Sequence, residues 1–162
     1  MKSYYNLSVI SDFWRCDMEI HISKELRQFN RLFSETGYAY HEAAVKLGLS
    51  DSVMNIFYSL CAEGEPCPLQ TVVRQSGASK QTINSAIRKL EGEDVLWLEP
   101  GRSRGKNVRL TEKGRALAER TVIPLMRMED EIYASWSKEE LRMYLELTGR
   151  FLTAFKEKIK RL

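Results

Sequence analysis

The sequence contains few of the residues that build disulfide frameworks and metal sites. It has three cysteines, Cys16, Cys61 and Cys67, and two histidines, His21 and His41. An odd number of cysteines without a CxxC motif argues against a disulfide scaffold, and two distant histidines argue against a zinc site. We therefore expect free thiols in a reducing cytoplasm, and no metal ion.

Long apolar runs and targeting segments are also missing. No stretch reaches the roughly 20 apolar residues that span a bilayer, and polar residues interrupt the apolar ones in positions 1–20, so no signal peptide is indicated. We expect no membrane partner. The sequence also lacks a glycine-rich phosphate loop, a nucleophile elbow and paired metal ligands, so we expect neither an enzyme nor a bound cofactor.

The chain has enough apolar residues for a core, and its charge is unevenly distributed. Hydrophobic residues make up 43% of the sequence, and the formal net charge is +3. Between Leu69 and Arg115 there are ten Lys or Arg residues against five Asp or Glu residues. Positive charge is therefore concentrated in the middle of the chain, which favours a polyanionic partner such as nucleic acid.

The pattern from Ser76 to Leu90 is typical of the turn and second helix of a helix-turn-helix. Gly77 can adopt the positive φ that ends a helix, and Ser79 can cap the first free N–H groups of the next helix. Apolar residues then recur three or four positions apart, which predicts one buried face. The residues of this face are Ile83, Ala86, Ile87 and Leu90.

The opposite face of this second helix is polar and cationic. Amide, hydroxyl and guanidinium groups reach base edges and phosphates when a recognition helix enters the major groove. The predicted DNA-binding residues of this helix are Lys80, Gln81, Thr82, Asn84, Ser85 and Arg88. Among them, Gln81, Asn84 and Arg88 are the candidates for base readout, and the others are expected to contact phosphates or bases.

A cationic hairpin is predicted directly after this helix. The apolar run 95–98 suits a strand, Pro100 and Gly101 are expected to break it, and residues 107–110 can return antiparallel. The loop between them has no acidic residue, so it can lie along a phosphate backbone or place an arginine in a minor groove. A solvated surface loop is the alternative. The predicted wing contacts are Arg102, Arg104 and Lys106.

The order of these segments resembles the multiple-antibiotic-resistance regulator (MarR) family. The resemblance covers roughly residues 20 to 160, and its most specific parts are the second helix and the segment Leu110-Thr111-Glu112-Lys113-Gly114. Leu47-Gly48-Leu49-Ser50 is similar to the family's entry into its DNA-binding domain. Arg104 matches the family's wing arginine, and Arg102 stands where the family usually has an aspartate.

The resemblance implies partners and regulation as well as a fold. It implies a homodimeric transcription regulator that acts as a repressor on double-stranded DNA with an inverted-repeat operator. It also implies a small aromatic effector that binds between the dimer helices and the winged domain and relieves repression. Some members of the family sense peroxides through an N-terminal cysteine, which makes Cys16 a candidate sensor. An ordinary semi-buried thiol is the simpler interpretation of Cys16.

We therefore predict a mainly α fold with a small β-wing, in which a winged helix-turn-helix is flanked by long N- and C-terminal dimerisation helices. Ser50, Thr111 and Ser137 are predicted helix caps, and Pro124 is expected to interrupt a helix near Thr121. The predicted domains are an N-terminal arm and dimerisation helix at 1–48, the DNA-binding domain at 49–114 and the C-terminal dimerisation helices at 115–162.

The sequence also allows two other interpretations of the winged helix. The domain can serve protein–protein contacts without specific DNA binding, in which case Gln81, Asn84 and Arg88 can change without loss of activity. It can also bind DNA without sequence preference as an architectural protein. The uncharged polar groups of the predicted recognition face argue against the second interpretation, because charge alone is enough for backbone binding.

Overall fold

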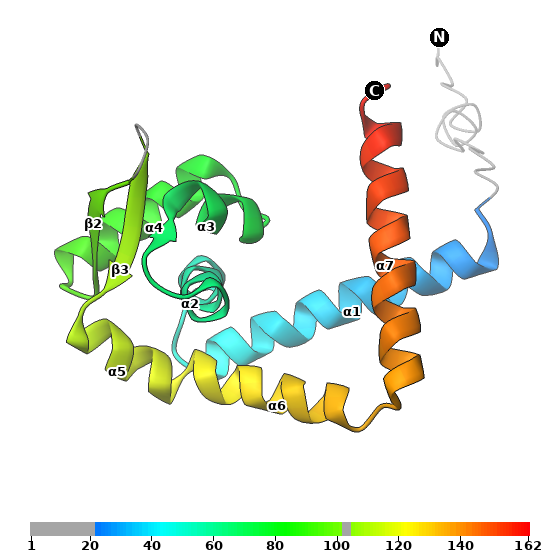
Figure 1. Ribbon diagram of the computed structural model, residues 1–162, viewed down its shortest axis with the longest axis horizontal. Coiled ribbons are helices and arrows are strands. Elements are labelled where there is room, and N and C mark those ends of the chain that lie inside the picture. The colour runs from blue at the N-terminus through cyan, green and yellow to red at the C-terminus, as the bar shows by residue number, and fades with distance from the viewer. Residues whose placement is uncertain (1–21, 102–104) are drawn as a thin grey trace, which may run out of the picture. The chain divides into compact units, whose positions relative to one another are not determined.

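The computed structural model describes residues 22–101 and 105–162. These residues form seven helices and three strands (Figure 1), and they divide into two units between Ala39 and Tyr40, within the first helix. The predicted mainly α fold with a small β-wing is confirmed. The elements are α1 Lys24–Lys46, α2 Asp51–Glu63, β1 Cys67–Pro68, α3 Leu69–Gln75, α4 Lys80–Gly92, β2 Leu96–Pro100, β3 Lys106–Leu110, α5 Glu112–Arg120, α6 Val122–Ala134 and α7 Lys138–Ile159.

The helices begin where side-chain caps were predicted. The Ser50 hydroxyl accepts a hydrogen bond from the Val53 backbone N–H at 3.4 Å, which starts α2. At the start of α7, the Ser137 hydroxyl accepts from the Glu140 N–H at 3.2 Å, and the Glu140 carboxylate accepts from the Ser137 N–H at 2.8 Å. This is a complete capping box. Hydrogen bonds from the Ser137 side chain and backbone to the Glu140 carboxylate lower its pKa, because they favour the charged form.

The predicted interruption near Thr121 is confirmed. Thr121 has φ −123° and ψ −81°, outside the helical range, and separates α5 from α6. Pro124 then lies in the first turn of α6, where a residue without an N–H loses no helical hydrogen bond.

The wing is an antiparallel sheet with the strand order β1-β3-β2. Leu96 pairs with Leu110 and Pro100 pairs with Lys106, so Pro100 is the last residue of β2, whereas the sequence predicted that the strand breaks at Pro100. An edge strand tolerates proline because one side of it needs no hydrogen-bond donor. Val95, which was predicted to be part of this strand, precedes it.

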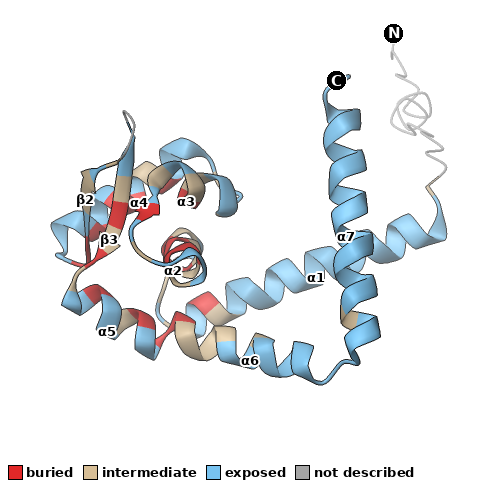
Figure 2. Ribbon diagram, viewed as in Figure 1, coloured by how far each residue is buried: buried red, intermediate tan, exposed pale blue. Residues whose placement is uncertain are grey.

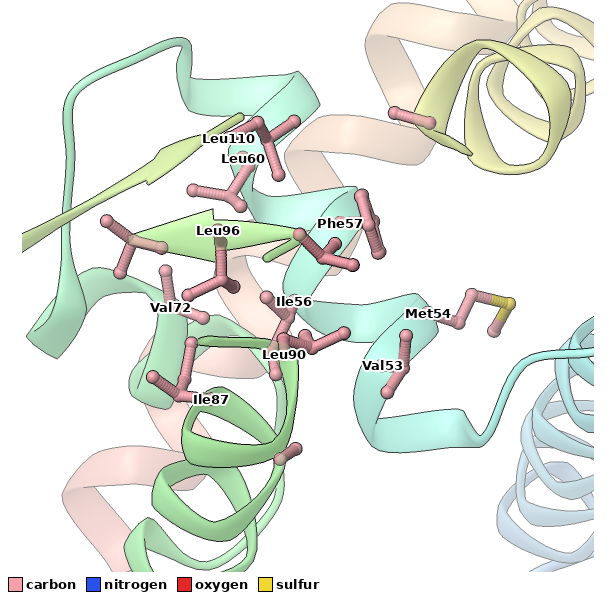
Figure 3. Packing of buried hydrophobic residues seen from close by; sticks show 14 of the residues in the cluster. Val53, Met54, Ile56, Phe57, Leu60, Val72, Ile87, Leu90, Leu96 and Leu110 are labelled. Carbon is pink, nitrogen blue, oxygen red and sulfur yellow. The ribbon is translucent and has the colours of Figure 1, made fainter. Parts of the chain in front are cut away.

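The core of the winged domain is built around α2. Ile56, Phe57 and Leu60 of this helix are at most 2% exposed, and Figure 3 shows them among apolar side chains of α3, α4 and the strands. The predicted apolar face of α4 is buried in this core, as the red segments of α4 in Figure 2 indicate. Because α2 packs against α3, α4, α6 and β1, α4 is held on a rigid support.

The terminal helices carry many large apolar side chains on their surfaces. Among the described residues of α7 none is buried, and the helix is almost entirely pale blue in Figure 2. Its exposed apolar residues are Met143, Tyr144, Leu145, Leu147, Phe151, Leu152, Phe155 and Ile159. On α1, Leu26, Phe29, Leu32 and Phe33 are exposed, and steps of three or four positions from Leu26 to Phe29 and from Phe29 to the other two place them on one side of the helix.

Candidate nucleic-acid interface

The turn between α3 and α4 is fixed by side chains of the turn itself and of α2. Gly77 has φ +64°, as predicted for a residue that ends a helix. The Ser79 hydroxyl accepts from the Thr82 backbone N–H at 3.1 Å and caps α4. The Asn55 side-chain amide of α2 donates to the Ser76 carbonyl at 3.2 Å, which ties the turn to the core helix.

The two faces of α4 are separated as the periodicity predicted. Ile83, Ala86, Ile87 and Leu90 are buried, and the polar residues on the other side reach solvent. Among the predicted DNA contacts of this helix, Lys80, Gln81, Thr82, Ser85 and Arg88 are exposed and Asn84 is half-buried. The structure therefore presents these six side chains on one accessible helix face, and their contact with DNA stays a prediction.

A cleft of about 850 Å³ lies between α3, the N-terminal part of α4 and the wing. Arg74, Lys80 and Lys106 bring three cationic groups to its walls, together with the Asn84 amide. The described residues that line the cleft include no acid. Such a cleft is complementary to a phosphate backbone, since each cation that neutralises a phosphate releases a bound counterion.

Sequence reasoning missed the contribution of α3 to this cleft. No residue of α3 is among the predicted DNA contacts, but Gln70, Thr71 and Arg74 line the cleft. Helical spacing places these three residues on the side of α3 opposite Val72, which is fully buried. The signal was therefore present in the periodicity of α3. The periodicity does not show where the wing lies, and the wing forms the other side of the cleft.

The wing hairpin brings one predicted contact to the same cleft. The Gly101 N–H donates to the Gly105 carbonyl at 2.9 Å and closes the hairpin. Lys106 follows at the start of β3, where it is exposed and lines the cleft. The other two predicted wing contacts, Arg102 and Arg104, lie outside the described residues, as do Cys16 and the rest of the N-terminal arm.

The base of the wing is anchored by an acidic side chain. The Glu65 carboxylate accepts from the Leu110 backbone N–H at 2.7 Å and pairs with the Arg115 guanidinium at 3.4 Å. Glu65 lies between α2 and β1, so this contact joins the end of the wing to the segment that leads into the helix-turn-helix. The wing and α4 are thereby held on the same support.

The described thiols and histidine form no second candidate site. Cys67 is buried and Cys61 is half-buried. Burial raises the pKa of both thiols, so neither is an activated thiolate. His41 Nδ1 lies 3.0 Å from an Asp51 carboxylate oxygen. Within residues 22–101 and 105–162, no group of His, Cys, Asp or Glu side chains is arranged to hold a metal ion.

Comparison with solved structures identifies the fold. NMB1585, a MarR family regulator from Neisseria meningitidis, aligns with a TM-score of 0.72 over 86% of this chain and 100% of its own, at 17% identity. A MarR family transcriptional regulator from Silicibacter pomeroyi gives 0.65 over 81% of this chain and 89% of its own, at 23% identity. This chain has the MarR-family winged-helix fold.

MepR from S. aureus, which was solved as a complex with DNA, has the same MarR-family fold. It aligns with a TM-score of 0.64 over 82% of this chain and 99% of its own, at 17% identity. No protein-family model matches the present sequence, and no curated protein matches it. The likeness to MarR-family proteins is therefore established at the level of the backbone. Among the described helices, none combines the length and apolarity needed to cross a bilayer.

Proposed function

We propose that this chain is a homodimeric, sequence-specific DNA-binding transcription regulator that acts as a repressor. The observation that carries the proposal is the exposed polar face of α4 beside a cleft that three cationic side chains line. Cations alone give affinity for any phosphate backbone. The amide groups of Gln81 and Asn84 and the Arg88 guanidinium add donors and acceptors that distinguish one base pair from another.

The proposed mode of binding places α4 in the major groove. Its buried side rests on α2, so the polar side is the one that meets the base edges. The DNA strand that borders the major groove then passes through the cleft of the protein, where Arg74, Lys80 and Lys106 neutralise its phosphates. The wing extends from the same cleft toward the neighbouring minor groove, where Arg102 and Arg104 are the proposed contacts.

The exposed apolar residues of α1 and α7 support the proposal of a homodimer. Apolar side chains at this density are normally covered, and a soluble monomer rarely exposes large contiguous apolar patches. A two-fold dimer doubles the base contacts of a single recognition helix, with the two copies of α4 about 34 Å apart on an inverted repeat. The same geometry explains how a small aromatic effector would relieve repression. The effector acts only if it prefers a different spacing of the two recognition helices.

The experiment that tests this function is selection of bound fragments from a pool of random double-stranded DNA. We expect the purified protein to enrich an inverted repeat whose half-sites are separated by about one helical turn. A variant with Gln81, Asn84 and Arg88 changed to Ala serves as the matched control, and it should enrich no sequence. A wild-type protein that enriches nothing would instead favour the interpretation that the winged helix serves protein contacts.

A further inference from the structure

The outer face of the wing carries three side chains that hold one another. β2 and β3 pair Trp97 with Arg109, and the Arg109 guanidinium lies 5.9 Å from the centre of the Trp97 ring. Arg109 Nε also lies 2.9 Å from Glu99 Oε2, at an angle that makes it an ion pair without a regular hydrogen bond. The cluster therefore joins both strands of the hairpin through one cationic group.

The exposure of these side chains shows that the cluster is built into the hairpin. Leu96, Val108 and Leu110 point into the core, and the alternation of the strands places Trp97, Glu99 and Arg109 on the other face. Trp97 is 45% exposed, but the side chains of Arg109 and Glu99 are only 32% and 22% exposed. A guanidinium held this way over an aromatic ring has little freedom left to reach a ligand.

Arg109 is also absent from the described walls of the cationic cleft, although Lys106, three positions earlier on β3, is one of them. A carboxylate such as Glu99 inside a basic wing would repel phosphates if it were unpaired. Arg109 neutralises Glu99 and at the same time fixes the two strands against each other. The absence of Arg109 from the cleft walls and its ion pair with Glu99 both distinguish it from the residues that face the cleft.

We propose that Arg109 is a positioning residue for DNA binding and not a DNA contact. Held between Glu99 and Trp97, it keeps the β2–β3 hairpin in the geometry that places Lys106 at the cleft. This inference rests on the proposed DNA-binding function, and it assigns a role to Arg109, a cationic residue of the wing that is not among the predicted DNA contacts.

The sign of the effect at Glu99 provides a sharp test. Glu99→Ala removes a negative charge from a DNA-binding surface, so simple electrostatics predicts tighter binding to the selected DNA site. The positioning role predicts the opposite, a loss of affinity of about threefold to tenfold, because Arg109 loses its ion pair and the hairpin loosens. Tighter binding by Glu99→Ala would overturn the proposal.

A double-mutant cycle separates positioning from direct contact. If Arg109 acts through Lys106, Arg109→Ala weakens binding in the wild-type background but changes it by less than about twofold in a Lys106→Ala background. Additive losses would mean that Arg109 does not act through Lys106, which contradicts the proposal. The exchanged pair Glu99→Arg with Arg109→Glu should recover most of the affinity, since it restores the ion pair with its charges reversed.

Amide hydrogen exchange of the free protein tests, without DNA, whether Glu99 and Arg109 stabilise the hairpin. Glu99→Ala and Arg109→Ala should each speed amide exchange in β2 and β3 by about fivefold, and they should leave α2 unchanged. If wild-type protein selects no DNA while these variants show faster exchange in the hairpin, the proposed DNA-binding function is refuted. The stabilisation of the hairpin by Glu99 and Arg109 is then still supported. Unchanged exchange in both variants would overturn the bracing itself.

Discussion

Gly114 lies against the backbone carbonyl of Val95, so closely that a Cβ at position 114 would come within 2.0 Å of the carbonyl oxygen. The same oxygen accepts a hydrogen bond from the Thr111 backbone N–H at 3.1 Å. The Thr111 hydroxyl in turn accepts from the Gly114 N–H at 3.1 Å and caps α5. This packing explains in physical terms why a threonine and a glycine stand three positions apart after the wing.

Replacement of Gly114 by alanine should therefore destabilise the winged domain. The added methyl group meets a backbone atom that cannot move without breaking the Thr111 hydrogen bond, so we expect a loss of about 1–3 kcal/mol in the free energy of unfolding. Urea unfolding measures this change. Gly92→Ala, at the last residue of α4, is the control and should be close to neutral, because no atom outside the adjoining backbone lies within 4 Å of the added Cβ. Equal losses in the two variants would contradict the packing argument.

The sequence predicted features that depend on a few neighbouring residues. Caps at Ser79 and Ser137, the positive φ of Gly77 and the break near Thr121 all follow from local hydrogen bonding and allowed backbone angles. The exposed face of α4 followed from periodicity for the same reason. Pro100 was misplaced because its place in a strand depends on which edge of the sheet it occupies, and strand order is not a local property.

Two features that join segments distant in sequence were not predicted. The cleft needs α3 and the wing side by side, and the role of Arg74 in it became visible only in the folded chain. The same holds for Glu129 of α6, whose two carboxylate oxygens accept hydrogen bonds from the hydroxyls of Tyr40 and Tyr58. These hydrogen bonds join Tyr40 of α1 and Tyr58 of α2 to α6.

The hydrogen bonds to Glu129 predict an unusual alkaline titration. Burial, and then the Glu129 carboxylate, raise the pKa of Tyr40 and Tyr58 well above the ordinary tyrosine value of about 10. A pKa raised in the folded state means that the stabilisation is present below pH ~10 and declines at higher pH, where only the unfolded chain ionises. We expect the free energy of unfolding to fall above pH ~10, and Tyr58→Phe to reduce that fall.

Absorbance at 295 nm, which reports tyrosinate, tests the role of the carboxylate. Glu129→Gln removes the negative charge but leaves the burial, so the pKa of both tyrosines should decrease without returning fully to the ordinary value. Identical titrations of wild type and Glu129→Gln would refute the assignment.

The proposed dimer predicts a specific effect of charge on α7. Leu145 and Leu152 are 59% and 49% exposed in the single chain, so glutamate at either position costs the folded chain little. If the helix is covered by a second copy, the buried charge is unfavourable and the dimer dissociates. Light scattering should report a fall from twice 18.8 kDa toward 18.8 kDa. Thr153→Glu, on the polar side of α7, should remain dimeric, and a monomeric wild type would refute the dimer.

The cleft predicts a salt dependence for Arg74. If Arg74 neutralises one phosphate, Arg74→Ala should weaken binding on all sequences about equally and should reduce the slope of log affinity against log salt by about 0.9. Lys138→Ala, at the first residue of α7, removes the same charge far along the chain and should leave the slope unchanged. An unchanged slope for Arg74→Ala would place the phosphate backbone outside the cleft.

The most direct test of the central claim, that the exposed face of α4 reads bases as one of two symmetric copies, is a base-pair substitution scan of the selected DNA site. Affinities of wild type and Arg88→Ala are measured for every single substitution. Wild type should lose about 1–3 kcal/mol at the base pair that Arg88 reads, once in each half-site, and Arg88→Ala should lose this discrimination at those two symmetric positions alone. Identical substitution profiles for the two proteins would contradict the claim.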